Sequence, residues 1–267
     1  MEFAERYGPW AVIAGASEGT GRSFADQSAA RGINCILIAR RSAPLNELAE
    51  NLRARHGVEC VIASVDLAAP DAFGRLVDVT GGREVGLFIN NAGSDTNDSR
   101  FLDGDLDNWE KLVERNVMTP MRMSHHFAKP MRDRGRGGII LVGSGACYGG
   151  ATGMAVYAGT KAFDLCFGEG LWAELRPHGV HVLNLILGRT NTPMFRAFME
   201  KRGLPVGDGA AEPDDVARLG LERLPHGPVQ NWGAADDQQG FAPISAAARR
   251  ERILKIEAAS NNLFKSK

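Results

Sequence analysis

Short apolar segments alternate with longer amphipathic segments along most of the chain. The apolar segments are rich in Val and Ile and have no polar face, which is typical of strands buried on both sides of a sheet. We predict six such strands: Trp10–Ala14, Asn34–Ala39, Cys60–Val65, Val85–Asn90, Gly138–Gly143 and Val180–Leu187.

The segments between these strands carry apolar residues at helical spacing, and several of them end at a glycine, the usual stop residue of a helix. The predicted helices are Arg22–Ala30, Leu45–Arg55, Trp109–Met131 and Ala155–Leu175. Strict alternation of strand and helix predicts a parallel sheet with helices on both faces. The fold class is therefore a doubly wound, Rossmann-like α/β fold, with residues 1–267 as one domain and ligands bound at the carboxyl ends of the strands.

The pattern is less regular toward the C-terminus. Residues 203–213 are rich in Gly, Pro and Asp, which predicts a mobile loop. Gly227–Trp232 fits a short last strand, and Ala246–Ala259 has helical periodicity. We treat residues 226–267 as a variable C-terminal region.

Charge and composition exclude several classes of partner. The chain has 31 Lys and Arg against 32 Asp and Glu, so it carries no basic surplus for nucleic acid or an anionic membrane. No apolar segment approaches the roughly 20 residues of a membrane helix, and the N-terminus lacks the apolar stretch of a signal peptide. The four cysteines have no metal-ligand spacing and suggest no disulfide framework. These features favour a cytoplasmic protein without a metal site.

A glycine-rich turn follows the first predicted strand. Gly15, Gly19 and Gly21 stand between that strand and the first helix, where backbone N–H groups and a helix N-terminus can bind a diphosphate. A plain tight turn is the alternative interpretation, but the position after the first strand favours a dinucleotide.

The end of the second strand bears on the choice of cofactor. An acidic residue there would bind the adenosine ribose of NAD(H), whereas this chain has Arg40 and Arg41. Guanidinium groups match the geometry of a 2′-phosphate. Ser17 adds a hydroxyl, while Glu18 adds an unfavourable negative charge. NADP(H) is favoured, and NAD(H) stays open because both arginines also fit as solvated residues.

Tyr157 and Lys161 lie four residues apart on a predicted helix and so share a face. A neighbouring ammonium favours the phenolate of a tyrosine, which suits that group to reversible proton transfer. The same spacing also occurs on ordinary helix faces. Ser144 ends the fifth strand, where it can hold a carbonyl oxygen, and Asn116 lies in the preceding long helix.

In these motifs, together with Asn90-Asn91-Ala92-Gly93 and Asn116-Val117, the chain resembles the short-chain dehydrogenase/reductase superfamily over approximately residues 8–195. The resemblance implies that Tyr157 is the general acid/base, Lys161 holds the nicotinamide ribose, Ser144 polarises the carbonyl and Asn116 supports a water relay. It also implies a homodimer or homotetramer and a lid over a small carbonyl or alcohol substrate, near residues 188–212. The residues expected to contact the cofactor are Gly15, Ser17, Glu18, Gly19, Thr20, Gly21, Arg40, Arg41, Asp66, Leu67, Asn90, Ala92, Gly93, Tyr157, Lys161, Gly188, Thr190 and Thr192.

The chain departs from the family pattern at Ala14, where a Thr is usual, and at Leu187-Gly188, where Pro-Gly is usual. In the lid region the spacing of the apolar residues gathers them on one helical face, which suits an aromatic, steroid or lipid-like substrate but also suits packing on the sheet. The candidate substrate contacts are Tyr148, Met154, Met194, Phe195 and Phe198.

Three alternatives to an NADP(H)-dependent reductase of bulky ketones remain. One is an NAD(H)-dependent catabolic alcohol dehydrogenase with the same mechanism. Another is a catalytically silent nucleotide sensor, which would have no need of the Tyr157 and Lys161 pair. The third is a sugar-nucleotide epimerase, which usually has a larger substrate domain than this chain supplies.

Overall fold

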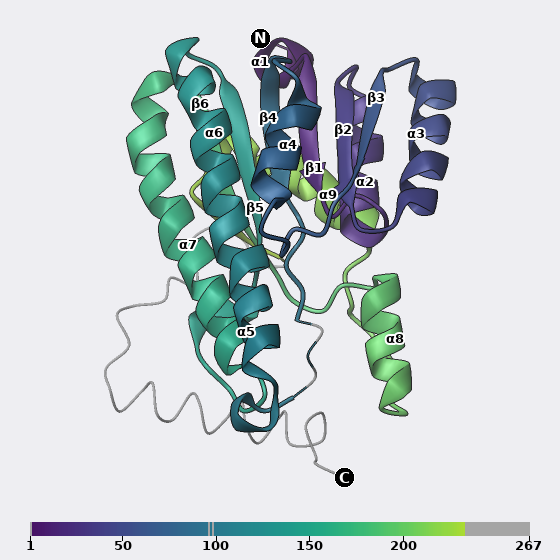
Figure 1. Cartoon of the computed structure of the whole chain (residues 1–267). Helices are drawn as coiled ribbons and strands as arrows, with labels where there is room; N and C mark the ends of the chain where they lie inside the picture. Colours follow the sequence, from purple (N-terminus) through teal and green to yellow (C-terminus); the bar gives the residue numbers. More distant parts are fainter. Residues whose placement is uncertain (1, 96, 98, 233–267) are drawn as a thin grey trace.

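A seven-stranded parallel sheet forms the centre of the molecule, in a computed structural model that describes residues 2–95, 97 and 99–232 (Figure 1). The strand order is β3-β2-β1-β4-β5-β6-β7, and every neighbouring pair is parallel. The predicted strands are all present, four with the predicted bounds and two shifted by one residue at one or both ends. The strands are β1 (Trp10–Ala14), β2 (Asn34–Ala39), β3 (Cys60–Ser64), β4 (Val85–Asn90), β5 (Gly137–Ser144), β6 (Val180–Leu187) and β7 (Val229–Asn231).

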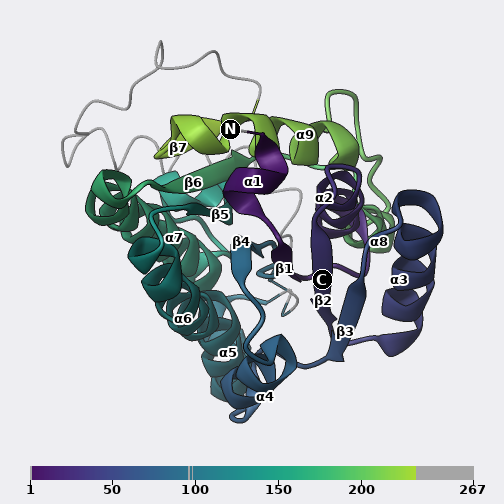
Figure 2. The same ribbon diagram turned by 90° about the horizontal axis from the view of Figure 1, so that it is seen from above.

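Helices cover both faces of this sheet, as Figure 2 shows. Helices α2 (Gly19–Ala29), α3 (Ser42–His56) and α9 (Pro213–Arg223) pack on one face, and α4 (Ala72–Thr80), α6 (Thr119–Asp133) and α7 (Ala155–Leu175) on the other.

Alternate residues of each strand enter the two cores. In β1, Ala11 and Ile13 join one core while Val12 and Ala14 join the other. This alternation explains why the strands have no polar face, and it confirms the predicted doubly wound fold.

The chain changes direction across the sheet at β1. From β1 it proceeds through β2 to β3, and it then returns to place β4 on the opposite side of β1. Open α/β sheets bind ligands at such a switch point, outside the carboxyl ends of the strands. Helices α5 (Leu106–Val113) and α8 (Pro193–Lys201) extend beyond this edge of the sheet (Figure 1).

The prediction of one continuous α-helix over Trp109–Met131 was wrong in one respect. The structure divides it into α5, a π-helical turn at Glu114–Met118, and α6. A π-turn inserts one extra residue into the helix and changes which side chains face inward, and such turns are frequent at functional sites.

Three helices were not predicted from the sequence: α1 (Phe3–Tyr7), α4 and α9. Helix α4 contains Gly74, Val77 and Val79, which are poor helix formers, so its stability comes from packing of buried residues such as Leu76. Helix α9 does carry helix-start signals, because Pro213 is followed by two aspartates.

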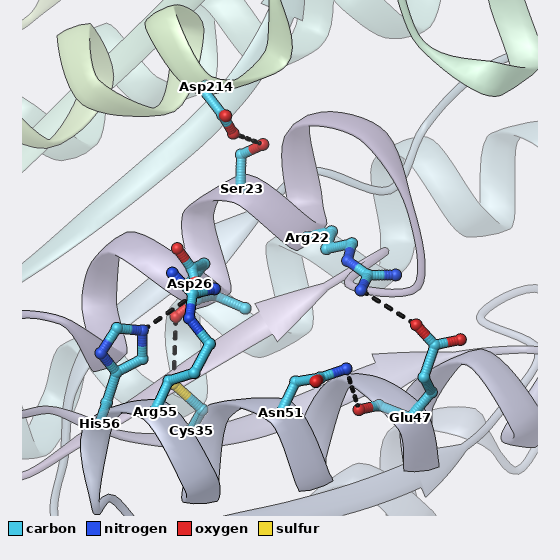
Figure 3. Close-up of polar contacts among 10 residues, drawn as sticks. Arg22, Ser23, Asp26, Cys35, Glu47, Asn51, Arg55, His56 and Asp214 are labelled. Carbon is cyan, nitrogen blue, oxygen red and sulfur yellow. Dashed lines mark hydrogen bonds and ion pairs between the residues drawn. The ribbon is translucent and has the colours of Figure 1, made fainter.

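Polar contacts fix α9 and α3 against α2. Ser23 Oγ donates to Asp214 Oδ1 at 2.5 Å, and Arg22 and Glu47 form an ion pair between α2 and α3 (Figure 3). The short last strand is confirmed as β7, whereas the predicted helix Ala246–Ala259 lies outside the described residues. Residues 203–212 contain no helix or strand, although Ala211 forms an isolated bridge with Thr190.

Within the described residues, no helix has the length and apolar character needed to cross a bilayer. The same part of the chain contains no cluster of three or more His, Cys, Asp or Glu residues arranged to hold a metal ion. None of the four cysteines forms a disulfide.

Candidate active site

The glycine turn after β1 is packed so tightly that side chains are excluded. A Cβ atom on Gly15, which has φ +79°, would lie 2.9 Å from the Ala92 nitrogen, and one on Gly21 would lie 2.0 Å from the Gly15 carbonyl oxygen. The turn leads directly into α2, whose first backbone N–H groups have no partner within the helix. Free N–H groups and the positive end of the helix dipole suit this turn to a diphosphate.

Three basic residues lie near this turn. Arg41 donates to Glu18 at 2.5 Å, which neutralises the acidic group that counted against a phosphate. Arg40, at the end of β2, is exposed. Arg115, which the sequence analysis did not single out, donates from Nη2 to the Ser94 carbonyl at 2.7 Å. Burial and the nearby charge of Arg40 lower the pKa of Arg115, and the nearby carboxylates of Asp66 and Asp95 oppose that decrease.

Other predicted cofactor residues lie at the carboxyl ends of strands or on the connections that follow them. A Cβ atom on Gly19 would come within 2.9 Å of Thr192 Cγ2, so the segment after β6 contacts the glycine turn. Asn90 is 1% exposed, and neither atom of its side-chain amide has a hydrogen-bond partner. Asp66 accepts from the Ala68 nitrogen at 3.1 Å and so caps the turn that follows β3.

Asn116 lies within the π-helical turn and is 0% exposed. Its Nδ2 donates to the Gly93 carbonyl and to Thr160 Oγ1, both at 3.1 Å. Thr160 in turn donates to the Tyr157 carbonyl at 2.7 Å. The structure therefore connects the end of β4, the π-turn and α7 through one buried amide.

Lys161 is 3% exposed and stands one turn after Tyr157 on α7. Its Nζ donates to the Val142 carbonyl of β5 and to Asp164 Oδ2, each at 3.0 Å. Asp164 is 1% exposed and was not predicted as a site residue, although a position three residues after Lys161 shares its helix face.

The charges of this pair depend on each other. Burial opposes the charge of Lys161, but the Asp164 carboxylate, with contributions from Tyr157 and Cys147, raises the pKa of Lys161 above its ordinary value. Burial raises the pKa of Asp164, and Lys161 opposes that increase. An ion pair removed from water is thus placed beside Tyr157.

Ser144 ends β5, and its Oγ accepts a hydrogen bond from the Ala146 nitrogen at 3.3 Å. Tyr148 follows on the same connection, and its hydroxyl donates to Asn231 Oδ1 of β7 at 2.7 Å. Ser144 and Tyr157 come from adjacent segments at the carboxyl edge, since α7 starts eleven residues after β5 ends.

The apolar residues of α8 do not share one environment. Met199 is buried, whereas Met194 is 39% exposed. The rings of Phe195 and Phe198 stack with centroids 6.5 Å apart, and the Arg202 guanidinium lies over the Phe198 ring. Helix α8 therefore combines a buried residue, Met199, with apolar residues that stay partly or largely exposed.

Comparison with known proteins decides the family. Residues 9–203 match the family model described as short chain dehydrogenase. The chain belongs to the short-chain dehydrogenase/reductase family. It is an NAD(P)-dependent oxidoreductase that acts on the hydroxyl or ketone group of a small molecule, which confirms the predicted family and class of enzyme.

Relatives in this family have several substrates. The chain is 32% identical over 225 residues to a 7beta-hydroxysteroid dehydrogenase of Clostridium sardiniense, covering 84% of this chain and 85% of the relative. It is 34% identical over 193 residues to a very-long-chain 3-oxoacyl-CoA reductase of Podospora anserina, covering 71% of this chain and 57% of that relative, so it spans little more than half of that protein.

Among solved structures, a short-chain dehydrogenase from Sphingobium yanoikuyae in complex with NADPH superposes with a TM-score of 0.76. It is 26% identical, and the match covers 97% of this chain and 96% of that chain. The whole described domain therefore follows the architecture of the family.

Proposed function

We propose that this enzyme uses NADP(H) to interconvert a ketone and a secondary alcohol on a hydrophobic substrate, with Tyr157 as the general acid/base. The observation that carries the proposal is the buried network in which Asn116 supports Thr160, beside Tyr157 and Lys161, next to the end of β5. This network holds α7, which carries the Tyr157 phenol and the Lys161 ammonium, against the π-turn and against β5, the strand that ends at Ser144.

The residues at this edge fit a nicotinamide dinucleotide. The glycine turn is a cradle that a single Cβ atom would fill, and both polar atoms of the buried Asn90 amide lack a hydrogen-bond partner within the protein. The turn and the start of α2 would hold the diphosphate, and Lys161 would hold the nicotinamide ribose. The cofactor supplies or accepts the hydride.

The protein residues then manage the proton and the carbonyl oxygen. In reduction, the Ser144 hydroxyl donates a hydrogen bond to the substrate oxygen, which polarises the carbonyl. The Tyr157 hydroxyl gives its proton to the same oxygen as negative charge develops there, and the Lys161 ammonium stabilises the resulting phenolate. In oxidation these steps reverse, with the phenolate taking the alcohol proton.

Cofactor choice is tested by replacing Arg40 with alanine. Arg40 is exposed at the end of β2, and Arg41 is paired with Glu18, so Arg40 is the group we assign to the 2′-phosphate. We expect Arg40→Ala to weaken NADPH binding by about 10-fold, the effect of losing one charge-assisted contact, and to leave NADH binding unchanged. Fluorescence titration with both cofactors measures this difference.

Arg55→Ala serves as the matched control, because that exposed arginine lies in the last turn of α3 and pairs with Asp26. An Arg40→Ala protein with wild-type NADPH affinity would remove the basis for this assignment. The alternative is an NAD(H)-dependent dehydrogenase of the same mechanism, and a wild-type preference for NADH would establish it.

The substrate class is tested with a panel of ketones. The hydroxysteroid and oxoacyl relatives, together with the part-buried Phe195 and Phe198 of α8, support a steroid or lipid-like carbonyl. We expect NADPH oxidation to be faster with steroidal and aromatic ketones than with short aliphatic ones. If short aliphatic ketones react as well, the hydrophobic substrate is rejected while the reductase assignment stands.

Assembly and location complete the proposal. The family resemblance supports a homodimer or homotetramer, which light scattering on the purified protein tests. Four cysteines that form no disulfide support a reducing compartment, and we assign the protein to the cytoplasm. Fractionation of the source cells checks this location.

A further inference from the structure

A buried ion pair on α7 lies behind the proposed catalytic lysine. Lys161 Nζ and Asp164 Oδ2 are 3.0 Å apart, and the two side chains are 3% and 1% exposed. Asp164 lies one turn of helix after Lys161, and Lys161 lies one turn after Tyr157. The three residues therefore follow one another along the same side of α7. The family resemblance assigns no role to Asp164.

Packing alone does not account for a carboxylate at this position. Transfer of a carboxylate from water into a protein interior is costly, and apolar residues of similar volume often stabilise a fold as well as a buried ion pair does. The cost is greater here because Asp164 Oδ1 has no hydrogen-bond partner. A residue that is expensive to bury, in contact with a functional group, points to a role in that group's chemistry.

We propose that Asp164 is the positioning residue and counter-ion of Lys161, keeping the buried amine charged and fixing the direction of its N–H bonds. An ammonium has three N–H bonds. Two are taken by Val142 and Asp164, which leaves one for a hydroxyl of the nicotinamide ribose. This inference rests on the roles proposed above for Lys161 and Tyr157.

The groups that face Lys161 determine what happens when the carboxylate is removed. They are Asp164 and Tyr157 on α7 itself and Cys147 from the connection after β5. Asp164→Asn keeps the size of the side chain but removes its charge. Burial then opposes the charge of Lys161 without its main counter-ion, which lowers the pKa of Lys161. Lys161 therefore loses its proton at a lower pH.

The first test is the pH profile of kcat for NADPH-dependent ketone reduction, which needs both Tyr157 and Lys161 protonated. We expect Asp164→Asn to move the alkaline limb of this profile to lower pH by about one unit or more. The matched control is Asp26→Asn on α2, because Asp26 is an ion-paired carboxylate that contacts Arg55 and His56 of α3 (Figure 3). The control keeps the wild-type limb.

The second test needs no turnover. In Asp164→Asn the folded pKa of Lys161 falls below its unfolded value, so the folded protein binds fewer protons than the unfolded chain between pH 7.5 and 10. Its stability therefore rises with pH in this window. The pKa of wild-type Lys161 is raised, so the stability of the wild-type protein receives no such increase from Lys161 over this pH range. We expect the Tm difference between the two proteins to narrow as the pH rises from 7.5 to 10.

Asp26→Asn again supplies the comparison, because the charge of its partner Arg55 does not titrate in this window and its Tm difference from the wild type stays constant. If Asp164→Asn does not fold, Asp164→Ser replaces it, since a smaller polar side chain admits a water molecule beside Nζ. The same two measurements and the same directions apply to Asp164→Ser.

Two results overturn the inference. One is a kcat that falls by the same factor at every pH with the alkaline limb unmoved. The other is a Tm difference that stays constant from pH 7.5 to 10, because a residue needed only for packing gives that result. Failure of the proposed function can be told apart from failure of this inference. An active Tyr157→Phe enzyme rejects the proposed mechanism. The Tm comparison needs no turnover, so it still decides whether Asp164 keeps Lys161 charged.

Discussion

Tyr157→Phe is expected to lower kcat about a thousandfold while changing NADPH affinity less than about twofold. The substitution removes only the hydroxyl that exchanges a proton with the substrate oxygen, and the ring remains to pack at the start of α7. Steady-state ketone reduction measures kcat, and fluorescence titration measures the dissociation constant of NADPH. Loss of turnover with retained cofactor binding places the missing group in the chemical step.

The chain contains three tyrosines, which provides a control for this experiment. Tyr7 lies in α1 and shares a hydrogen bond of 2.6 Å with His181 Nδ1, away from the carboxyl edge of the sheet. Tyr7→Phe removes a buried hydroxyl at a cost of about 1 kcal/mol in stability and leaves kcat unchanged. A Tyr157→Phe enzyme that retains more than about a tenth of wild-type activity contradicts the assignment of Tyr157 as the proton donor.

Strand positions were predictable from the sequence because burial on both faces imposes a purely apolar pattern. Ala11 to Ile13 contribute to the two cores in alternation, so each of these positions needs an apolar side chain. Helix positions were less predictable, because tertiary packing overrides local preference, as it does in α4. The π-turn around Asn116 could not be read at all, since one inserted residue leaves the apolar periodicity nearly unchanged.

The proposed site shows the same division between local and long-range information. The spacing of Tyr157 and Lys161 is local, and their shared helix face followed from it. Asp164 had an equally local signal, but an aspartate on a helix is usually solvated, and only the fold reveals that this one is buried beside Lys161. Arg115 reaches Ser94 through the packing of the π-turn on the β4 connection, a contact between residues 21 apart in sequence.

Lys161→Met is expected to be the most destabilising substitution in the site, because it leaves the Asp164 carboxylate buried without its partner. Removal of one member of a buried ion pair costs about 3–5 kcal/mol in the free energy of unfolding. Burial already raises the pKa of Asp164 in the wild type, and loss of the ammonium raises it further. The folded variant then binds more protons than the unfolded chain, so its stability falls as pH rises above the unfolded pKa of Asp.

Urea unfolding of Lys161→Met at pH 5 and pH 7.5 measures this effect, and we expect the larger loss at pH 7.5. The double variant Lys161→Met/Asp164→Leu is the control, because it replaces both charges with apolar groups and should recover most of the lost stability. Both variants lack turnover, since neither retains the ammonium beside Tyr157. Equal instability of the single and the double variant would mean that the loss comes from the methionine itself, and the Asp164 carboxylate would then have no part in it.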